Sequence, residues 1–422
     1  MKTKPILPNS LRLSTITGFF LKLLGVGLLF LMHTFLSRQI GSEGYGTFSY
    51  TLALTGLLAV IVPLGLPTAL VRFIVEYQEK EQWNLFHGVI LRSNQIVLAS
   101  SILTALVLWL IANSKSTSDN LSVSLNFAIL IVPLIAFIAL HRKAFQGLQK
   151  PNTGTAFEEV FLPFTVLTGL FLFPIITASE ALSIYVIASF IVLIISSIKL
   201  RLSLPPQSLN VPPHFRTRIW IAVALPMVFG QVSQTILNRT DILMLGVMTD
   251  MDEVGFYSAA NRLAVLNTFV LSVVNTIATP KLAVAYYNHQ PQKFQAIRSW
   301  MIKLSILGAL PLFLLIMIWP KFLLSFFGTE FTQGNSLLRI LNIGQFINAV
   351  TGPVGFILLM TGREKQFALS MAVVAMINMF GNFLLIPLWE SLGAALMTAT
   401  GVALLNGWQF WISKSILSTE NI

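Results

Sequence analysis

The sequence predicts an all-α polytopic membrane protein with about twelve transmembrane helices in two six-helix bundles related by a parallel internal repeat. Three observations support this: 55% hydrophobic but only 10% charged residues, apolar runs long enough to cross a bilayer, and a segment that returns in the second half of the chain. Soluble domains carry about a quarter charged residues. The expected solvent of this chain is therefore the bilayer.

The apolar runs predict helices rather than a barrel. Crossing about 30 Å of hydrocarbon takes roughly 20 residues of helix, whereas barrel strands alternate polar and apolar residues over about ten positions. No such alternation is present in this sequence. The predicted spans lie near residues 14–36, 46–70, 89–112, 122–141, 158–178, 181–198, 219–246, 254–279, 299–319, 335–360, 367–388 and 392–413.

The positive charges predict the orientation of the chain. With the N-terminus inside, about 20 of the 27 lysines and arginines fall in cytoplasmic segments and about four in outer ones, as the positive-inside rule requires. This places both termini in the cytoplasm. The net charge of +11 therefore mostly sets the orientation. A nucleic-acid partner is the weaker interpretation because the cations are spread over separate cytoplasmic segments, and we expect membrane lipids and no nucleic acid as partners.

Several function classes are excluded by residues that the sequence lacks. It has no cysteine, hence no disulfide and no thiolate metal site, and no Gly-Lys dipeptide, hence no phosphate-binding loop of an ATP-driven pump. The triplet Asp250-Met251-Asp252 resembles a nucleotide-sugar metal motif, but the topology places it outside, where an acidic loop is the better interpretation. We expect no catalytic residue, no metal and no cofactor.

A proline-rich polar segment marks the middle of the chain. The stretch KLRLSLPPQSLNVPPHFRTR, residues 199–218, carries four prolines and is typical of an extended, semi-rigid linker. It follows the sixth predicted span. We therefore predict an N-terminal six-helix bundle over residues 1–200, a cytoplasmic linker at 201–218 and a C-terminal six-helix bundle over 219–422.

An internal repeat relates the two halves. FLSRQIGSEGYGTFSYTLAL at 35–54 is echoed by MLGVMTDMDEVGFYSAANRLAV at 244–265, and a shift of about 209 residues pairs Gly46 with Gly255. A second match pairs QGLQKP at 146–151 with TGREKQ at 361–366. Each half has an even number of spans, so the two share one orientation about an axis along the membrane normal. The glycines predict a tight outer hairpin after the first span of each half.

These segments carry a family resemblance. Together with GLPTALVR at 65–72 and TDILMLGVMTDMDEVGFYSAANRL at 240–263, they resemble the Wzx-type polysaccharide-export flippases of the multidrug/oligosaccharidyl-lipid/polysaccharide exporter superfamily. The resemblance covers essentially the whole chain. It implies a monomeric transporter, not an enzyme, that flips an undecaprenyl-pyrophosphate-linked oligosaccharide to the periplasmic leaflet of the bacterial inner membrane, for O-antigen or lipopolysaccharide synthesis. Implied partners are this lipid-linked oligosaccharide and a polysaccharide polymerase or glycosyltransferases.

Polar side chains inside the predicted spans are the candidate site. An ionisable residue at mid-span costs about 2.5 to 3.5 kcal/mol, so each needs a partner, a wet cavity or a route to the interface. Helical spacing gives the first, seventh and eighth spans one polar face each, and further polar candidates lie at the end of GLPTALVR and in the span near 335–360. The predicted headgroup cations are Lys22, Arg239, Arg262 and Arg72. The predicted polar lining is Gln231, Gln234, Asn238, Asn261, Asn275, Asn342 and Gln345.

Asp241 and Arg262 lie at similar predicted depth on consecutive helices. A structural ion pair is the default interpretation, and a proton or cation switch is the alternative. If they pair, Arg239 is the uncompensated cation, and we expect it to contact a pyrophosphate together with Lys22. Lys22 can also snorkel toward the interface, and Arg72 equally fits a positive-inside anchor. Asn342 and Gln345 share a face at i, i+3 and equally fit sugar hydroxyls or hydrogen bonds between helices.

Two rival functions remain. A cation-coupled drug exporter of the same superfamily should carry carboxylates in its first spans, yet spans one to four have none at depth, and Glu158 and Glu159 begin the fifth. A membrane-embedded polysaccharide-synthesis enzyme should display a large external loop, and none is predicted. The sequence therefore favours an anionic substrate and leaves the glycan and the energy source open.

Overall fold

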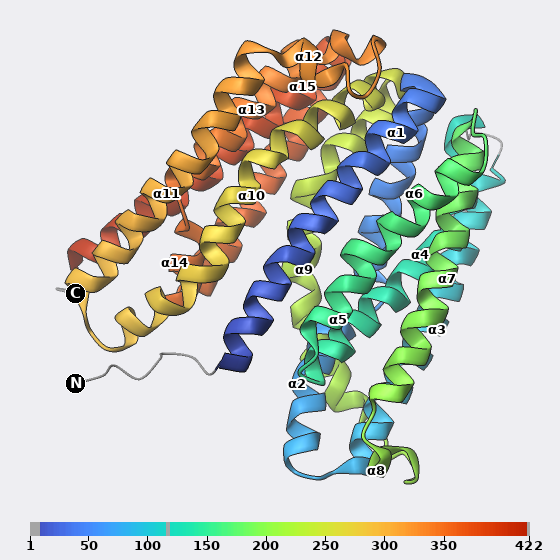
Figure 1. Cartoon of the computed structure of the whole chain (residues 1–422), viewed down its shortest axis with the longest axis vertical. Helices are drawn as coiled ribbons and strands as arrows, with labels where there is room; N and C mark the ends of the chain where they lie inside the picture. Colours follow the sequence, from blue (N-terminus) through green and yellow to red (C-terminus); the bar gives the residue numbers. More distant parts are fainter. Residues whose placement is uncertain (1–8, 115–118, 420–422) are drawn as a thin grey trace. The chain divides into compact units, whose positions relative to one another are not determined.

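The computed structural model describes residues 9–114 and 119–419, and every regular element within these ranges is a helix (Figure 1). Both extreme ends of the chain, whose orientation the charges predict, lie outside the described residues. The elements are α1 (Asn9–Ile61), α2 (Leu66–Glu79), α3 (Trp83–Ala112), α4 (Asp119–Gly147), α5 (Pro151–Thr155), η1 (Ala156–Phe161), α6 (Leu162–Leu172), α7 (Ala178–Ser203), α8 (Pro206–Leu209), α9 (Thr217–Met248), α10 (Met251–Tyr287), α11 (Pro291–Ile318), α12 (Pro320–Leu324), η2 (Glu330–Gly334), α13 (Asn335–Thr351), α14 (Val354–Met360) and α15 (Glu364–Thr419).

Candidate membrane spans account for most of the described chain. Eight helices are long and apolar enough to cross a bilayer, and there are up to ten if each of two bent pairs forms one span. The bent pairs are Met251–Asn275 with Ala278–Tyr287, and Glu330–Thr351 with Val354–Met360.

Two of the candidate spans are interrupted by a single non-helical residue. In α1 the break is Gly41 (φ 70°, ψ −177°), and in α15 it is Glu390 (φ 48°, ψ −131°). The hairpin predicted within residues 35–54 is therefore mostly helical and concentrates its break in Gly41. Glycine reaches this positive φ without a Cβ penalty, so one residue is enough to break the helix. Glu390 adopts a comparable φ at a steric cost.

The chain forms two compact units. Unit 1 comprises Met1–Ile40 and Thr51–Thr235, and unit 2 comprises Gly41–Tyr50 and Ile236–Ile422. Helices α1 and α9 thus contribute to both units. Within unit 1, α4 packs against α2, α3 and α7. Within unit 2, α13 packs against α10, α11 and α15, which are the yellow, orange and red helices of Figure 1.

The proline-rich linker is docked onto α3 in unit 1. The backbone N–H of His214 donates to the Asn84 carbonyl at 2.9 Å, and the guanidinium carbon of Arg92 lies 4.2 Å from the Phe215 ring centroid. A Cβ on Gly88 would be only 2.0 Å from the His214 carbonyl oxygen. The linker also contains the short helix α8. The linker therefore packs against α3 of unit 1 and is not only an extended connection between the halves.

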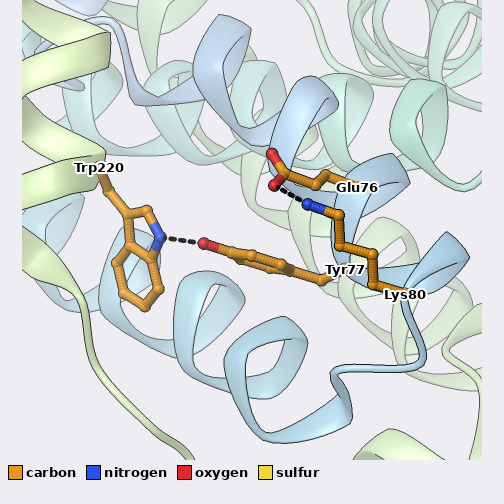
Figure 2. A network of polar contacts seen from close by, with 4 residues as sticks. All are labelled: Glu76, Tyr77, Lys80 and Trp220. Carbon is orange, nitrogen blue, oxygen red and sulfur yellow. Dashed lines mark hydrogen bonds and ion pairs between the residues drawn. The ribbon is translucent and has the colours of Figure 1, made fainter.

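A buried hydrogen bond fixes the start of α9 to α2 within unit 1. Figure 2 shows the indole N–H of Trp220 donating to the Tyr77 hydroxyl at 2.9 Å. On the next turn of α2, the Lys80 ammonium lies 2.7 Å from Glu76, and this hydrogen bond holds the pKa of the Glu76 carboxyl below its ordinary value. The Trp220 and Tyr77 side chains are buried, whereas the ion pair is on the surface.

Candidate functional site

A buried carboxylate with neutral partners is the main polar cluster of unit 2. Asp241, on α9, is 4% exposed. Its Oδ2 accepts from the Tyr257 hydroxyl at 2.9 Å and from Thr398 Oγ1 at 2.6 Å, and its Oδ1 accepts from Asn382 Nδ2 at 2.6 Å. These donors come from α10 and from α15. One carboxylate thus joins three helices through dipoles alone.

Helix α15 supplies donors to Asp241 from both sides of its break. Asn378 and Asn382 share a face at i, i+4 and are bonded at 3.0 Å, whereas Thr398 follows the break at Glu390. The Asn382 Oδ1 atom is buried and has no hydrogen-bond partner among the described residues. A desolvated carboxylate beside an unsatisfied acceptor favours whatever brings positive charge or a donor, such as a proton or a small cation.

The predicted ion pair between Asp241 and Arg262 is not formed in this structure. Arg262 Nε instead donates to the Tyr45 hydroxyl at 3.2 Å, and Tyr45 is fully buried. The helical spacing explains the difference. Tyr257 and Arg262 are five residues apart on α10, so their side chains diverge by about 140°. With Tyr257 facing Asp241, Arg262 faces the first copy of the repeat.

Some of the predicted amides of unit 2 are buried, and others are partly or fully exposed. Asn342 is buried, its Nδ2 donates to the Phe313 carbonyl at 3.1 Å, and its Oδ1 accepts from Asn267. It therefore joins α13, α11 and α10, as the alternative of interhelical bonding predicted. Gln345 and Asn275 are also buried, Asn261 is half-buried and Asn238 is exposed.

The predicted residues of unit 1 lie on three helices. Gln231 Nε2 donates to Thr68 Oγ1 at 2.7 Å, which joins α9 to α2. Gln234 is exposed on α9, and Arg72 is exposed on α2. Lys22 is exposed on α1.

Lys22 and Arg239, the two preferred headgroup cations, belong to different units. Lys22 extends from the part of α1 that belongs to unit 1. Arg239 is half-buried on the part of α9 that belongs to unit 2. Their joint contact with one headgroup stays a prediction.

Sequence reasoning missed an ionic cluster in unit 1. Arg142, near the end of α4, reaches Glu158 Oε1 at 3.0 Å and Glu159 Oε1 at 3.4 Å through its two terminal nitrogens. The two glutamates lie on η1, a π-helical turn inside a candidate span. In the sequence, Arg142 is only one of about 20 basic residues that the positive-inside rule places in cytoplasmic segments. The adjacent acids at the start of an apolar run were the one available signal.

A multi-pass helical protein with charged and amide side chains along its candidate spans has the character of a membrane transporter. The chain belongs to the polysaccharide biosynthesis protein family, whose model matches residues 14–285, and the MatE family model matches residues 226–404. This is a family of transporters and flippases, not of enzymes. The expectations of a membrane transporter, a flippase family and a link to polysaccharide biosynthesis are confirmed.

Two relatives cover most of the chain. The probable low-salt glycan biosynthesis flippase Agl15 of Haloferax volcanii is 24% identical over 92% of this chain and 80% of its own length. The capsular polysaccharide biosynthesis protein CapF of Staphylococcus aureus is 22% identical over 87% of this chain and 91% of its own length.

Solved structures share the fold. An inward-facing multidrug resistance MATE family transporter matches with a TM-score of 0.77 at 12% identity, over 96% of this chain and 99% of its own. The lipid II flippase MurJ in an inward closed conformation matches with a TM-score of 0.76 at 15% identity, over 95% and 87%. The prediction of an all-helical, multi-pass membrane protein is confirmed, with the MATE-like fold.

Proposed function

We propose that this protein flips a lipid-linked oligosaccharide, carried on undecaprenyl pyrophosphate, from the cytoplasmic to the periplasmic leaflet by alternating access. The observation that carries the proposal is the match of the polysaccharide biosynthesis family model over residues 14–285. Two relatives named for glycan or capsular polysaccharide biosynthesis, at 24% and 22% identity, support it. The glycan would serve surface polysaccharide synthesis, with a polymerase or glycosyltransferases as further partners of a monomeric transporter.

The proposed topology has twelve crossings with both termini in the cytoplasm of a bacterial cell. Ten candidate spans are the upper count. The candidate segments within the two interrupted helices, Ile16–Ile61 and Glu364–Lys414, are 46 and 51 residues long, which is enough for two crossings each. The division into residues 1–200, 201–218 and 219–422 follows the sequence repeat. The compact units instead group the start of α9 with unit 1. In this proposal the two halves are defined by the sequence repeat. The compact units are defined by which residues pack together, so their boundary need not coincide with that of the halves.

The proposed headgroup ligands are Lys22 and Arg239, assisted by Arg262 and Arg72. A pyrophosphate carries several oxygens that accept charge-assisted hydrogen bonds from lysine and arginine. Arg262 is half-buried with its Nε held by Tyr45, so its position is set before the substrate arrives. The exposed amides Gln234 and Asn238 suit sugar hydroxyls.

The proposed coupling residue is Asp241. Its three neutral donors and its burial make the carboxylate a site where binding of a proton or a cation changes the local charge by a full unit. Such a change biases a transporter between states when the two states solvate the carboxylate differently.

A second candidate function is cation-coupled drug export. The MatE family match over residues 226–404 and the TM-score of 0.77 to a multidrug transporter favour it. Structural likeness at 12% identity supports a shared fold and leaves the substrate open. The names of the sequence relatives favour the glycan substrate.

The test is complementation of a strain that lacks its own lipid-linked oligosaccharide flippase. Replacing both Lys22 and Arg239 with Ala should abolish surface polysaccharide in that strain, while Lys80→Ala, which removes an exposed ammonium from an ion pair on α2, should leave it intact. Undiminished polysaccharide in the double variant would refute the assigned headgroup site. Failure of the wild-type chain to complement, together with protection against drugs, would favour the exporter.

A further inference from the structure

A second set of charges lies inside unit 1, apart from the Asp241 cluster. One guanidinium, that of Arg142, contacts two carboxylates that follow each other in the chain, Glu158 and Glu159. All three side chains are about one third exposed, at 34%, 35% and 29%. These three side chains are therefore partly buried but still accessible to a ligand.

A π-helical turn presents the two glutamates. Successive side chains on an α-helix diverge by about 100°, whereas π-turns are wider, rare and frequent at functional sites. The neighbouring helices press on this turn. A Cβ on Gly154 would lie 2.7 Å from the Arg142 carbonyl oxygen, and a Cβ on Gly25 would lie 2.5 Å from the Glu159 carbonyl oxygen. Helix α1 is thus in close backbone contact with η1, and α4 with the adjoining α5.

Lys22 lies on the face of α1 that meets this segment. Gly18, Lys22 and Gly25 fall within an arc of about 60°, and a Cβ on Gly18 would be 3.0 Å from Asn152 Oδ1 in α5. The ammonium of Lys22 attracts the Glu159 carboxylate electrostatically. Two cations from different helices, Lys22 and Arg142, therefore act on a single carboxylate.

The glutamates are themselves not fully hydrogen-bonded. Glu158 Oε2 is buried and has no hydrogen-bond partner among the described residues, so one of its oxygens has lost water without gaining a donor. Lys143 acts electrostatically on Glu158 but donates its hydrogen bond to Gln146 at 3.2 Å. A guanidinium fork that holds two separate carboxylate oxygens has the geometry to hold two oxygens of a diphosphate instead.

We propose that Glu158 and Glu159 are internal counter-anions, which occupy Arg142 and Lys22 until an anionic diphosphate headgroup displaces them. The inference rests on the proposed function and adds Arg142 to its binding residues. The exchange replaces two carboxylate charges with those of the diphosphate, so the cations are never left uncompensated in a low dielectric. The competition also weakens substrate binding, which lets the headgroup leave on the far side.

The test measures binding of inorganic pyrophosphate to the full chain in detergent by calorimetry. Glu159→Gln removes one competing charge and should lower the Kd about tenfold, and the double variant with Glu158→Gln should lower it further. Arg142→Gln should abolish binding. The matched control is Asp250→Asn, which removes an exposed carboxylate that makes no side-chain cap hydrogen bond at the start of α10 and should leave the Kd unchanged. Thermal unfolding of each variant identifies any that fail to fold, and Arg142→Lys then replaces Arg142→Gln, with an expected loss of at least tenfold in affinity.

The results separate this inference from the proposed function. An unchanged or raised Kd in a folded Glu159→Gln variant would overturn the inference, and so would the absence of pyrophosphate binding in both the wild type and the double variant. Neither result affects complementation by the wild-type chain. Conversely, a tighter Kd in the glutamine variants combined with failed complementation would support the anion exchange and overturn the lipid-linked glycan as substrate.

Discussion

Gly46 and Gly255, which occupy the same position in the two copies of the repeat, lie against each other's backbone in unit 2. A Cβ on Gly46 would be 1.8 Å from the Met251 carbonyl oxygen, and a Cβ on Gly255 would be 2.3 Å from the Ser42 carbonyl oxygen. Ser42 also donates a hydrogen bond from its hydroxyl to Asp252. The repeated glycines are therefore explained by two helices that meet backbone to backbone, as small residues allow in membrane proteins.

Adding one methyl at this crossing should separate the helices. We predict that Gly46→Ala and Gly255→Ala each lower the stability of the detergent-solubilised protein by about 1 to 3 kcal/mol, the usual range for overpacking. Thermal unfolding by size-exclusion chromatography measures the change. Gly27→Ala is the control, because its Cβ meets nothing within 4 Å, and alanine should be neutral or stabilising in a helix. Equal unfolding temperatures for the two sets would contradict the close approach.

Removing the charge of Asp241 should uncouple transport without unfolding the protein. Asp241→Asn keeps an oxygen for Tyr257 and Thr398, and its amide N–H can donate to Asn382 if the Asn382 amide turns its unpartnered Oδ1 toward it. The variant cannot bind a cation by charge, so we predict at least a tenfold loss of transport with a near-normal unfolding temperature. Asp250→Asn is the control, since Asp250 is exposed and makes no side-chain cap hydrogen bond at the start of α10. Full transport by Asp241→Asn, with unchanged dependence on pH and sodium, would exclude the coupling role.

The Tyr45 hydroxyl should matter for stability through Arg262. Tyr45→Phe leaves Arg262 Nε without its acceptor in a half-buried site, which should cost about 1 to 3 kcal/mol. Denaturant or thermal unfolding measures this cost. The same substitution at the exposed Tyr287 should change little. If Tyr45→Phe is as stable as the wild type, the hydrogen bond does not hold Arg262 in place.

The contact between Trp220 and Tyr77 offers a double-mutant cycle. The single changes Trp220→Phe and Tyr77→Phe each break the buried hydrogen bond in Figure 2, so their effects should not add. Couplings of this kind in membrane proteins average about 0.6 kcal/mol and reach about 1.7. Thermal unfolding of the four proteins gives the coupling, and additive effects would show that the bond does not fix α9 to α2.

The sequence predicted the solvent, the helical class and most spans, because long apolar runs leave few alternatives in a bilayer. The sequence did not predict the positions where a single non-helical residue interrupts a long helix. The segment 35–54 has the composition of a loop, yet backbone groups in a membrane must be paired, so the helix continues on both sides of Gly41. The unusual φ of Glu390 has no comparable signal, because glutamate rarely adopts it.

The sequence predicted which residues belong to the candidate site better than it predicted which side chains contact one another. The depth of Asp241 and Arg262 could be read from their positions in the spans, but their partners depend on how the helices are rotated. Tyr257 and Thr398, which bind Asp241, carry no mark that distinguishes them from other polar residues of α10 and α15. The π-turn that brings both glutamates to Arg142 depends on packing against α1 and α4, so the apolar pattern does not contain it.

The most direct test of the account is translocation in proteoliposomes that contain the purified full chain and a fluorescent diphosphate-linked oligosaccharide lipid. A membrane-impermeant quencher reports the fraction of label in the outer leaflet. Wild-type protein should bring the inner-leaflet pool to the quencher, whereas the variant with both Lys22→Ala and Arg239→Ala should leave about half of the label protected, as in protein-free vesicles. Equal protection with wild-type protein and with empty vesicles, under every ion and pH gradient applied, would contradict it.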